Sequence, residues 1–253
     1  MSPAPEAFPG PETGSIDVHS HLLPGIDDGC RDIGESLESV RRLQQAGYAG
    51  TICTPHIWPE TFPANTAENI RQWTRLLQQR LEDEGLDYPI WPGGEVRLFD
   101  GVIDWFEKRE VPTLAGTRWV LTDMWEDAWP KWADAAFDWL LEHDYKPILA
   151  HPERLNVGDL NPHLDDLMSR GVTLQGNFLP MTGEDGFIAD RRVREYLSEG
   201  RYGLLALDMH RPDSLESRLD GLELVRQEFG DDIVRRGTVE APRELILAEV
   251  PAG

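Results

Sequence analysis

The sequence has little lysine, few cysteines and no long apolar run. Among its 253 residues, 24 are Lys or Arg and 46 are Asp or Glu, which gives a formal net charge of −22. Lysine occurs only at Lys108, Lys131 and Lys146, so most of the basic residues are arginines. Nucleic-acid and anionic-membrane surfaces are bound by basic patches, and this charge balance therefore argues against both kinds of partner.

The two cysteines, Cys30 and Cys53, are too few for a disulfide framework, which favours a reducing, cytoplasmic location. No apolar segment approaches the roughly 18 residues of a membrane-spanning helix, so we expect no membrane insertion. Residues 1–14 lack the basic and apolar regions of a signal peptide. Their proline and glycine content predicts a disordered tail over 1–15, followed by a single domain over 16–253.

Short apolar runs alternate with amphipathic stretches along the rest of the chain. We expect strands within 15–23, 50–57, 88–99, 118–125, 146–154, 172–179 and 202–210. We expect helices within 32–47, 66–85, 132–145, 162–171, 190–200 and 218–230. This alternation predicts an α/β fold with a parallel sheet, and about seven units favour a barrel over two domains. An open doubly wound sheet is the alternative, although no glycine-rich phosphate loop follows the first strand.

The segment "DVHSHLLPGIDDG" at residues 17–29 carries the first concentration of reactive side chains. Asp17, His19 and His21 alternate along the first strand, and the two-residue period of a strand predicts that all three share one face. Three such side chains on a buried strand are unfavourable unless they bind something.

The carboxyl ends of the other predicted strands also carry histidines and carboxylates. With those of the first strand, the candidate residues are His19, His21, Asp28, His56, Glu95, Asp123, His151, Asp208 and His210. In a parallel barrel these ends meet at one rim, where active sites form. Each residue alone has a simpler explanation, such as a helix cap or a hydrogen-bonded core histidine. Together the carboxylates would repel one another without a cation, so we predict a metal cluster that suits Mn²⁺, Fe²⁺ or Zn²⁺.

Two further features carry weaker expectations. Cys53 is expected to be an inert core thiol, whereas Cys30 follows the "DDG" turn and lies in sequence close to the predicted site. The segment "MWEDAWPKW" contains Trp125, Trp129 and Trp132 after the fourth strand. Packing of this loop over the rim is the simplest interpretation, and a cleft wall that stacks on an aromatic substrate is the alternative.

The motifs "DVHSHLLPGIDDG", "TPH", "PGGEV", "AHPER" and "DMH", in this order, resemble the polymerase and histidinol phosphatase (PHP) superfamily. The closer resemblance, over residues 16–247, is to its bacterial metal-dependent tyrosine-protein phosphatases of capsule and exopolysaccharide biosynthesis. The resemblance implies a distorted (β/α)7 barrel with two or three divalent ions, Mn²⁺ being favoured over Fe²⁺ or Zn²⁺. It implies hydrolysis of phosphotyrosine by a metal-bridged hydroxide, the protein substrate being a bacterial tyrosine kinase of polysaccharide synthesis or export.

The resemblance also implies a role for each motif residue. The first ion would be held by His19, His21, Glu95 and Asp208. The second ion would share Glu95 and add Asp123 and His151, and the third would be held by Asp28, His56 and His210. Arg154 of "HPER" would bind the phosphoryl group, with Arg218, or alternatively Arg211, as its second cation. The family usually has Glu where this chain has Asp123, which is one methylene shorter.

Two other functions are compatible with these motifs. A PHP phosphoesterase acting on a small molecule, such as histidinol phosphate or a nucleotide, shares the same metal residues because specificity resides in loops. A non-catalytic metal-binding module is the other alternative, although the complete ligand set disfavours it. The Cys-x5-Arg loop of cysteine phosphatases is absent from the sequence, so no phosphocysteine intermediate is implied.

Overall fold

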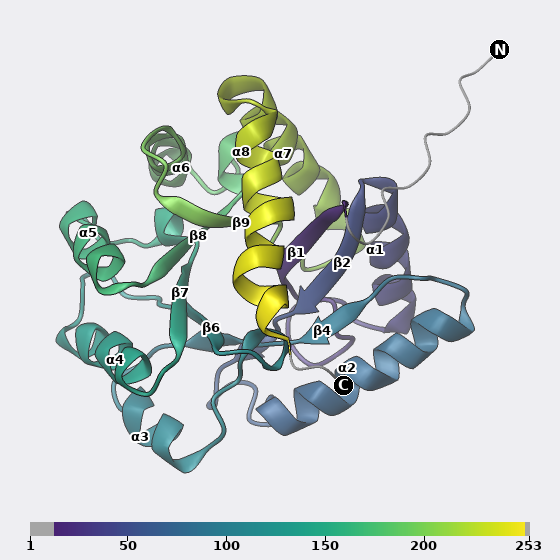
Figure 1. Cartoon of the computed structure of the whole chain (residues 1–253), viewed down its shortest axis with the longest axis horizontal. Coiled ribbons are helices and arrows are strands. Elements are labelled where there is room, and N and C mark those ends of the chain that lie inside the picture. Colours follow the sequence, from purple (N-terminus) through teal and green to yellow (C-terminus); the bar gives the residue numbers. More distant parts are fainter. Residues whose placement is uncertain (1–12, 251–253) are drawn as a thin grey trace.

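The structure is a computed structural model that describes residues 13–250. Most of the predicted tail therefore lies outside the described residues, and the first strand begins at Ser15. Parallel strands form a ring that is surrounded by helices (Figure 1). The strands are β1 (Ser15–Ser20), β2 (Tyr48–Cys53), β3 (His56–Ile57), β4 (Ile90–Pro92), β5 (Glu95–Arg97), β6 (Trp119–Asp123), β7 (Lys146–Ala150), β8 (Thr173–Asn177) and β9 (Tyr202–Ala206).

Two sheets share these strands, in the orders β1-β2-β4 and β3-β5-β6-β7-β8-β9. Every strand pair is parallel, which confirms the predicted α/β class. β3 continues β2 after Thr54 and Pro55, and β5 continues β4 after two glycines, so the described strands make seven passes. Pro55 has no N–H for a ladder, and its carbonyl accepts from the Glu95 N–H at 3.1 Å. A Cβ at Gly94 would lie 2.8 Å from the Ile57 side chain, so only glycine fits at this break.

β9 returns beside β1 at the carboxyl ends of the two strands. The His21 N–H donates to the Met209 carbonyl at 2.8 Å, and the Asp208 N–H donates to the His19 carbonyl at 3.0 Å. Nearer the start of β1, the Asp17 carboxylate accepts from the Leu207 N–H at 3.1 Å in place of a backbone partner. Single hydrogen bonds rather than a regular ladder therefore join these strands, as expected of a distorted barrel.

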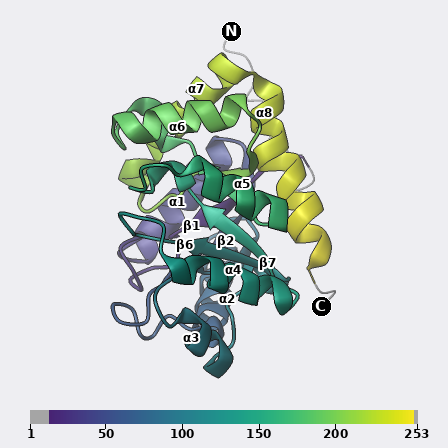
Figure 2. The same ribbon diagram turned by 90° about the vertical axis from the view of Figure 1, so that its left-hand side faces the viewer.

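Six helices match the predicted amphipathic stretches and lie outside the strands (Figure 2). They are α1 (Ile33–Gln45), α2 (Ala67–Asp83), α4 (Lys131–Glu142), α5 (Asn161–Arg170), α6 (Phe187–Ser198) and α7 (Leu215–Phe229). The Asp32 side chain caps α1 by accepting from the Glu35 N–H, and Thr66 caps α2 in the same way. The sequence analysis missed α3 (Val102–Lys108) and α8 (Asp231–Arg235).

The helix α8 continues through two π-helical turns, Arg236–Glu240 and Pro242–Ile246, across the amino ends of the strands. The Thr238 hydroxyl lies 3.0 Å from the hydroxyl of Ser15, the first residue of β1. Ala241 and Ile246 join the apolar interior of the ring, together with residues such as Ile16 and Ile148. This end of the barrel is therefore covered, and the carboxyl ends of the strands lie opposite it.

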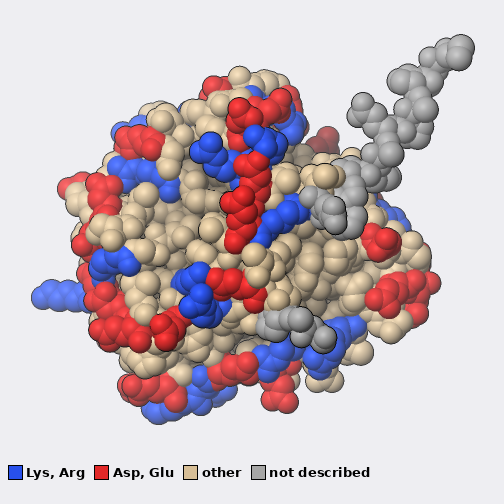
Figure 3. Space-filling view, viewed as in Figure 1, with Lys and Arg blue, Asp and Glu red and all other residues tan. Residues whose placement is uncertain are grey.

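No helix among residues 13–250 is long and apolar enough to cross a membrane. On the face shown in Figure 3, Lys and Arg side chains are interspersed with Asp and Glu around the periphery. The basic residues on this face are thus distributed among acidic ones and do not form a continuous basic field.

Candidate metal centre

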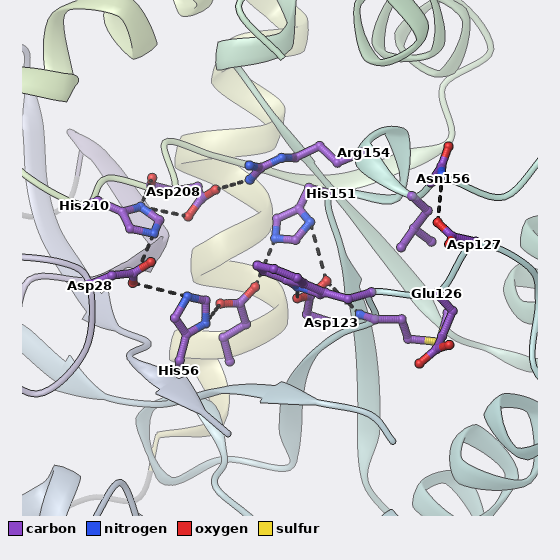
Figure 4. Close-up of a pocket in the computed structure, with 14 residues that line it drawn as sticks. Asp28, His56, Asp123, Glu126, Asp127, His151, Arg154, Asn156, Asp208 and His210 are labelled. Carbon is purple, nitrogen blue, oxygen red and sulfur yellow. Dashed lines mark hydrogen bonds and ion pairs between the residues drawn. The ribbon is translucent and has the colours of Figure 1, made fainter. Parts of the chain in front are cut away.

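A cavity of about 380 Å³ opens at the carboxyl ends of the strands. Seven of the nine predicted metal residues line it (Figure 4), namely Asp28, His56, Glu95, Asp123, His151, Asp208 and His210. The other two, His19 and His21, are fully buried and contact Glu95 and Asp208. The structure therefore brings all nine side chains into one cluster.

Four ligand atoms converge at the innermost part of the cluster. His19 Nε2 lies 3.5 Å from both Glu95 Oε2 and Asp208 Oδ1, and His21 Nε2 lies 3.6 and 3.4 Å from the same two atoms. Within the described chain, His19 Nε2 and His21 Nε2 are buried without a hydrogen-bond partner, and Glu95 Oε2 lies 2.7 Å from His56 Nδ1 in an ion pair. Buried polar atoms are normally paired, so two unpaired imidazole nitrogens directed at two carboxylate oxygens fit a divalent cation.

Hydrogen bonds on the far side of each ring orient these two histidines. The side-chain NH2 group of Gln175 donates to the Gly176 carbonyl and to Asn177 Oδ1. Gln175 Oε1 therefore accepts from His19 Nδ1, at 2.9 Å. Asp27 Oδ2 accepts from His21 Nδ1 at 2.8 Å. Both rings therefore donate from Nδ1 and direct Nε2 into the cluster, which is the arrangement of metal-ligating histidines.

The sequence analysis did not assign these supporting residues. Gln175 and Asn177 lie on β8, and the Asn177 amide also donates to Asp208 Oδ2 at 2.9 Å. Asp27 is the first residue of the "DDG" turn. Its carboxylate also accepts from the N–H groups of His56 and Gly29, both at 3.0 Å. A Cβ at Gly29 would lie 2.2 Å from the His21 carbonyl, so the "DDG" turn requires glycine for this fold-back.

The second group surrounds the other oxygen of Glu95. His151 Nε2 lies 3.0 Å from Glu95 Oε1, and His151 Nδ1 lies 3.8 Å from Asp123 Oδ1. Ligand atoms of Glu95, Asp123 and His151 all lie within 4.8 Å of one another. The Asp123 carboxylate also accepts from the Met124 N–H at 2.7 Å and from the Trp125 indole N–H. Although shorter than Glu, Asp123 thus lies beside Glu95 and His151.

The third group lies at the mouth of the cavity. Asp28 Oδ1 is 3.3 Å from His56 Nε2 and 3.6 Å from His210 Nε2. His210 Nδ1 donates to the Asp208 carbonyl at 3.0 Å, which directs its Nε2 toward Asp28. His21 also approaches this group, so its ring stands between the first and third sets of ligand atoms.

The prediction that Asp17 shares a face with His19 and His21 is wrong. Relative to β2, β1 carries one extra residue between Asp17 and Ser20, which is a bulge that breaks the two-residue period. Ile16 and Val18 belong to the apolar interior, and Asp17, which lies between them, bonds to the backbone beyond β9. The bulge allows His19 and His21 to reach the cluster without Asp17.

Two of the candidate ligands have left-handed backbone conformations. His151 has φ 32° and Asp208 has φ 53°, and each follows directly or nearly directly after a strand. Non-glycine residues rarely adopt such conformations, which cost of order 1–3 kcal/mol each and concentrate at functional sites. The His151 N–H is held by the Gln175 carbonyl at 2.7 Å, so β8 supports both His19 and this turn.

The carboxylates dominate the electrostatics of the cluster. Burial disfavours the charged form of Glu95 and Asp208, but neighbouring imidazoles outweigh it and hold both pKa values well below the usual range. Burial likewise opposes protonation of the histidines, yet adjacent carboxylates raise the pKa of His21 to about 10, His56 to about 11 and His151 to about 9. The field in the cavity therefore strongly favours positive charge at its centre.

Arg154 is the arginine that lines the cavity among the described residues. Its Nη1 lies 2.9 Å from Asp208 Oδ2, its Nε lies 3.5 Å from Asp185 Oδ2, and its side chain is 40% exposed. Arg218 is buried behind the site and donates to the carbonyls of Asp208 and Ser214, both at 2.8 Å. Neither Arg218 nor Arg211 belongs to the described lining, so the structure does not bring a second arginine to the cavity.

Both cysteines lie outside the cavity lining and are fully buried in the layer between strands and helices. Burial raises the pKa of the Cys30 thiol to about 11 and that of Cys53 further. The expectation that Cys53 is an inert core thiol fits this position, and Cys30, although close in sequence to the site, is also a core residue.

These observations define a parallel α/β barrel with a cluster of imidazole and carboxylate ligands at the carboxyl rim. Residues 15–247 match the family described as capsular polysaccharide synthesis, CpsB/CapC, and the chain belongs to that family. It is 33% identical over 234 residues to the tyrosine-protein phosphatase YwqE of Bacillus subtilis, covering 92% of this chain and 91% of that protein. It is 27% identical to the putative tyrosine-protein phosphatase CapC of Staphylococcus aureus, covering 93% of this chain and 94% of CapC.

A solved structure supports the same relationship. It comes from crystal structures of YwqE from Bacillus subtilis and CpsB from Streptococcus pneumoniae, described as metal-dependent tyrosine phosphatases. The match has a TM-score of 0.80 at 25% sequence identity and covers 94% of this chain and 96% of that one. The parallel α/β fold and the family resemblance expected from the sequence are thereby confirmed.

Proposed function

We propose that this protein is a metal-dependent protein-tyrosine phosphatase. The observation that carries the proposal is the convergence of two unpaired, buried imidazole nitrogens, those of His19 and His21, on carboxylate oxygens of Glu95 and Asp208. These atoms lie beneath a cavity lined by Arg154. YwqE, which is 33% identical and is matched over 91% of its length, is a tyrosine-protein phosphatase, which supports the substrate class.

The proposed ligand sets follow the three groups of the cluster. The first ion is held by His19, His21, Glu95 and Asp208, the second by Glu95, Asp123 and His151, and the third by Asp28, His56 and His210. Nitrogen and oxygen donors without a thiolate suit Mn²⁺, with Fe²⁺ or Zn²⁺ as alternatives. Bound ions would supply Lewis-acid polarisation of the phosphoryl oxygens and would lower the pKa of water.

The chain's own side chains perform the remaining tasks. Arg154, 40% exposed and held by Asp208 and Asp185, presents its guanidinium to the cavity and binds phosphoryl oxygens as a planar donor. Arg218 fixes the Asp208 carbonyl, and with it the left-handed turn that directs Asp208 into the cluster. Direct binding of phosphate by Arg218 stays a prediction. The tyrosine leaving group, with a reference pKa of about 10, needs little help from a protein acid.

We also propose that the physiological substrate is a tyrosine kinase of polysaccharide synthesis or export and that the protein acts in the cytoplasm. The family's link to capsular polysaccharide synthesis supports the first point. The two free, buried cysteines are compatible with a reducing compartment.

The test compares substrates on the purified, metal-loaded full chain. Rates are measured on a phosphotyrosine peptide, a phosphoserine peptide of matched sequence, histidinol phosphate and a nucleoside monophosphate, with the metal content determined in parallel. The proposal predicts metal-dependent turnover with a strong preference for phosphotyrosine. Faster turnover of histidinol phosphate or the nucleotide would identify a small-molecule phosphoesterase, and metal binding without any turnover would identify a non-catalytic module.

A further inference from the structure

Trp125 is an exposed tryptophan at the edge of the metal centre. Its side chain is 60% exposed, and it lines the same cavity as the predicted ligands and Arg154. The other two tryptophans of the same segment, Trp129 and Trp132, pack against the core. Packing of the loop over the rim thus accounts for those two and leaves the exposure of Trp125 unexplained.

Trp125 is fixed in place despite this exposure. Its indole N–H donates to the Asp123 carboxylate. Its ring lies 5.4 Å from that of Trp58 at an interplanar angle of 55°. The Arg97 guanidinium lies 4.1 Å from the centre of the Trp58 ring and 5.8 Å from that of Trp125. Trp58, Arg97 and Trp125 therefore form a preorganised aromatic–cation unit beside the cavity.

Such a unit suits an aromatic group that enters with a phosphate. An exposed aromatic ring at the edge of a cavity offers a face on which a ligand ring can stack, and an indole held by its N–H loses little entropy on stacking. Resting on the proposed phosphatase function, we propose that Trp125 is the specificity-determining wall that stacks on the aromatic ring of phosphotyrosine while Arg154 contacts its phosphoryl group.

The Trp125 indole has a second role, which a substitution can separate from stacking. Its N–H bond holds Asp123, a proposed ligand, so Trp125→Ala removes both the ring and the hydrogen bond. Trp125→Phe keeps an aromatic face, although a smaller one, and removes the hydrogen bond. Phe187, which is 77% exposed at the start of α6 and outside the described cavity lining, supplies a matched control for loss of an exposed ring.

The experiment measures dissociation constants of phenylphosphonate and methylphosphonate by calorimetry on the metal-loaded full chain. The ratio of the two constants reports recognition of the ring, because any effect through Asp123 or the metal acts on both ligands. We expect Trp125→Ala to reduce the phenyl preference by roughly threefold to tenfold. Trp125→Phe should retain most of the preference, and Phe187→Ala should leave it unchanged.

An unchanged ratio in Trp125→Ala would overturn the inference and leave the proposed function intact. Failure of the wild-type protein to hydrolyse the phosphotyrosine peptide would instead overturn the proposed function, while the ratio would still show whether Trp125 binds an aryl group. If the wild-type protein hydrolysed the phosphotyrosine peptide but bound phenylphosphonate no more tightly than methylphosphonate, the inference would be wrong and the proposed function would stand.

Discussion

Asp27 provides a direct test of how the metal ligands are oriented. Its buried carboxylate accepts from the His21 ring at 2.8 Å and from the N–H groups of His56 and Gly29 at 3.0 Å. Burial opposes ionisation of this carboxyl, but the charge of His21 and these hydrogen bonds hold its pKa below the usual value. Removal of the carboxylate therefore affects the tautomer of His21 as well as the folding of the "DDG" turn.

Asp27→Ala should weaken both metal binding and stability. Loss of a carboxylate that supports a ligating histidine typically lowers metal affinity 10- to 100-fold, which corresponds to about 1.4–2.8 kcal/mol. Each buried donor left without an acceptor costs roughly 1–3 kcal/mol, so three of them should lower the free energy of unfolding by about 3 kcal/mol or more. In Asp27→Asn, the side-chain oxygen can still accept from His21 and His56. The side-chain NH2 group then faces the Gly29 N–H, so this hydrogen bond is lost. The Asn variant should therefore lose stability but retain most of its metal affinity.

The assay combines calorimetric titration of Mn²⁺ into the metal-stripped full chain with urea denaturation. Asp213→Ala serves as the control, because this carboxylate is 70% exposed and lies 3.7 Å from its nearest cationic partner, Arg211. Wild-type metal affinity in Asp27→Ala would refute the reasoning, since His21 would then need no support to present its Nε2.

Three further predictions concern Asp123, Asp17 and the surface charge. Asp123→Ala should lower both the occupancy of the second ion and the turnover rate, and it should leave the His19–His21 site filled. Asp123→Glu should be better tolerated. Metal analysis and kinetics check this prediction, and full metal occupancy at an unchanged rate in Asp123→Ala would remove Asp123 from the proposed ligand set. Burial raises the pKa of Asp17 from 3.8 to about 7, so between these pH values the folded chain holds a proton that the unfolded chain has lost, and stability falls as pH rises through this window. Asp17→Asn should therefore gain up to about 4 kcal/mol relative to wild type between pH 4 and pH 8, measured by urea denaturation, and a pH-independent difference would contradict the assignment. Because the chain has a net charge of −22, repulsion between its charges destabilises the folded state and salt should screen it. The melting temperature should therefore rise as NaCl increases from very low concentration to about 0.1 M, where the Debye length is near 10 Å. A flat or falling melting temperature would show that the charges are already paired locally.

The fold could be predicted from the sequence because the hydrophobic residues of its strands and helices recur at different intervals. Short apolar runs and six amphipathic stretches predict the parallel α/β order, and the caps at Asp32 and Thr66 mark two helix starts. The C-terminal helical segment escaped prediction because Gly237 and Pro242 interrupt it and both are poor helix formers. Gly237 lies against Leu205, where a Cβ would come within 2.7 Å, so packing on β9 outweighs propensity here.

The clustering of the candidate ligands was predictable because histidines and carboxylates at the carboxyl ends of parallel strands lie at one rim. The residues and backbone features that orient these side chains were not predictable. The bulge that excludes Asp17 is a single extra residue with no compositional trace. Gln175 and Asn177 look like ordinary strand residues, and only the register of β8 shows that they hold His19 and Asp208. The direction of Arg218 depends on the loop after β9, which sequence spacing does not determine.

Anomalous scattering from crystals of the protein soaked in Mn²⁺ would test the central claim most directly. The account predicts a peak between His19 Nε2, His21 Nε2 and Glu95 Oε2, with further peaks beside Asp123 and His151 and beside Asp28 and His210. In His21→Ala crystals the first peak should weaken or vanish together with phosphotyrosine hydrolysis in solution. Crystals of the wild-type protein with no peak in this cluster, from a preparation that hydrolyses phosphotyrosine without metal, would contradict the account.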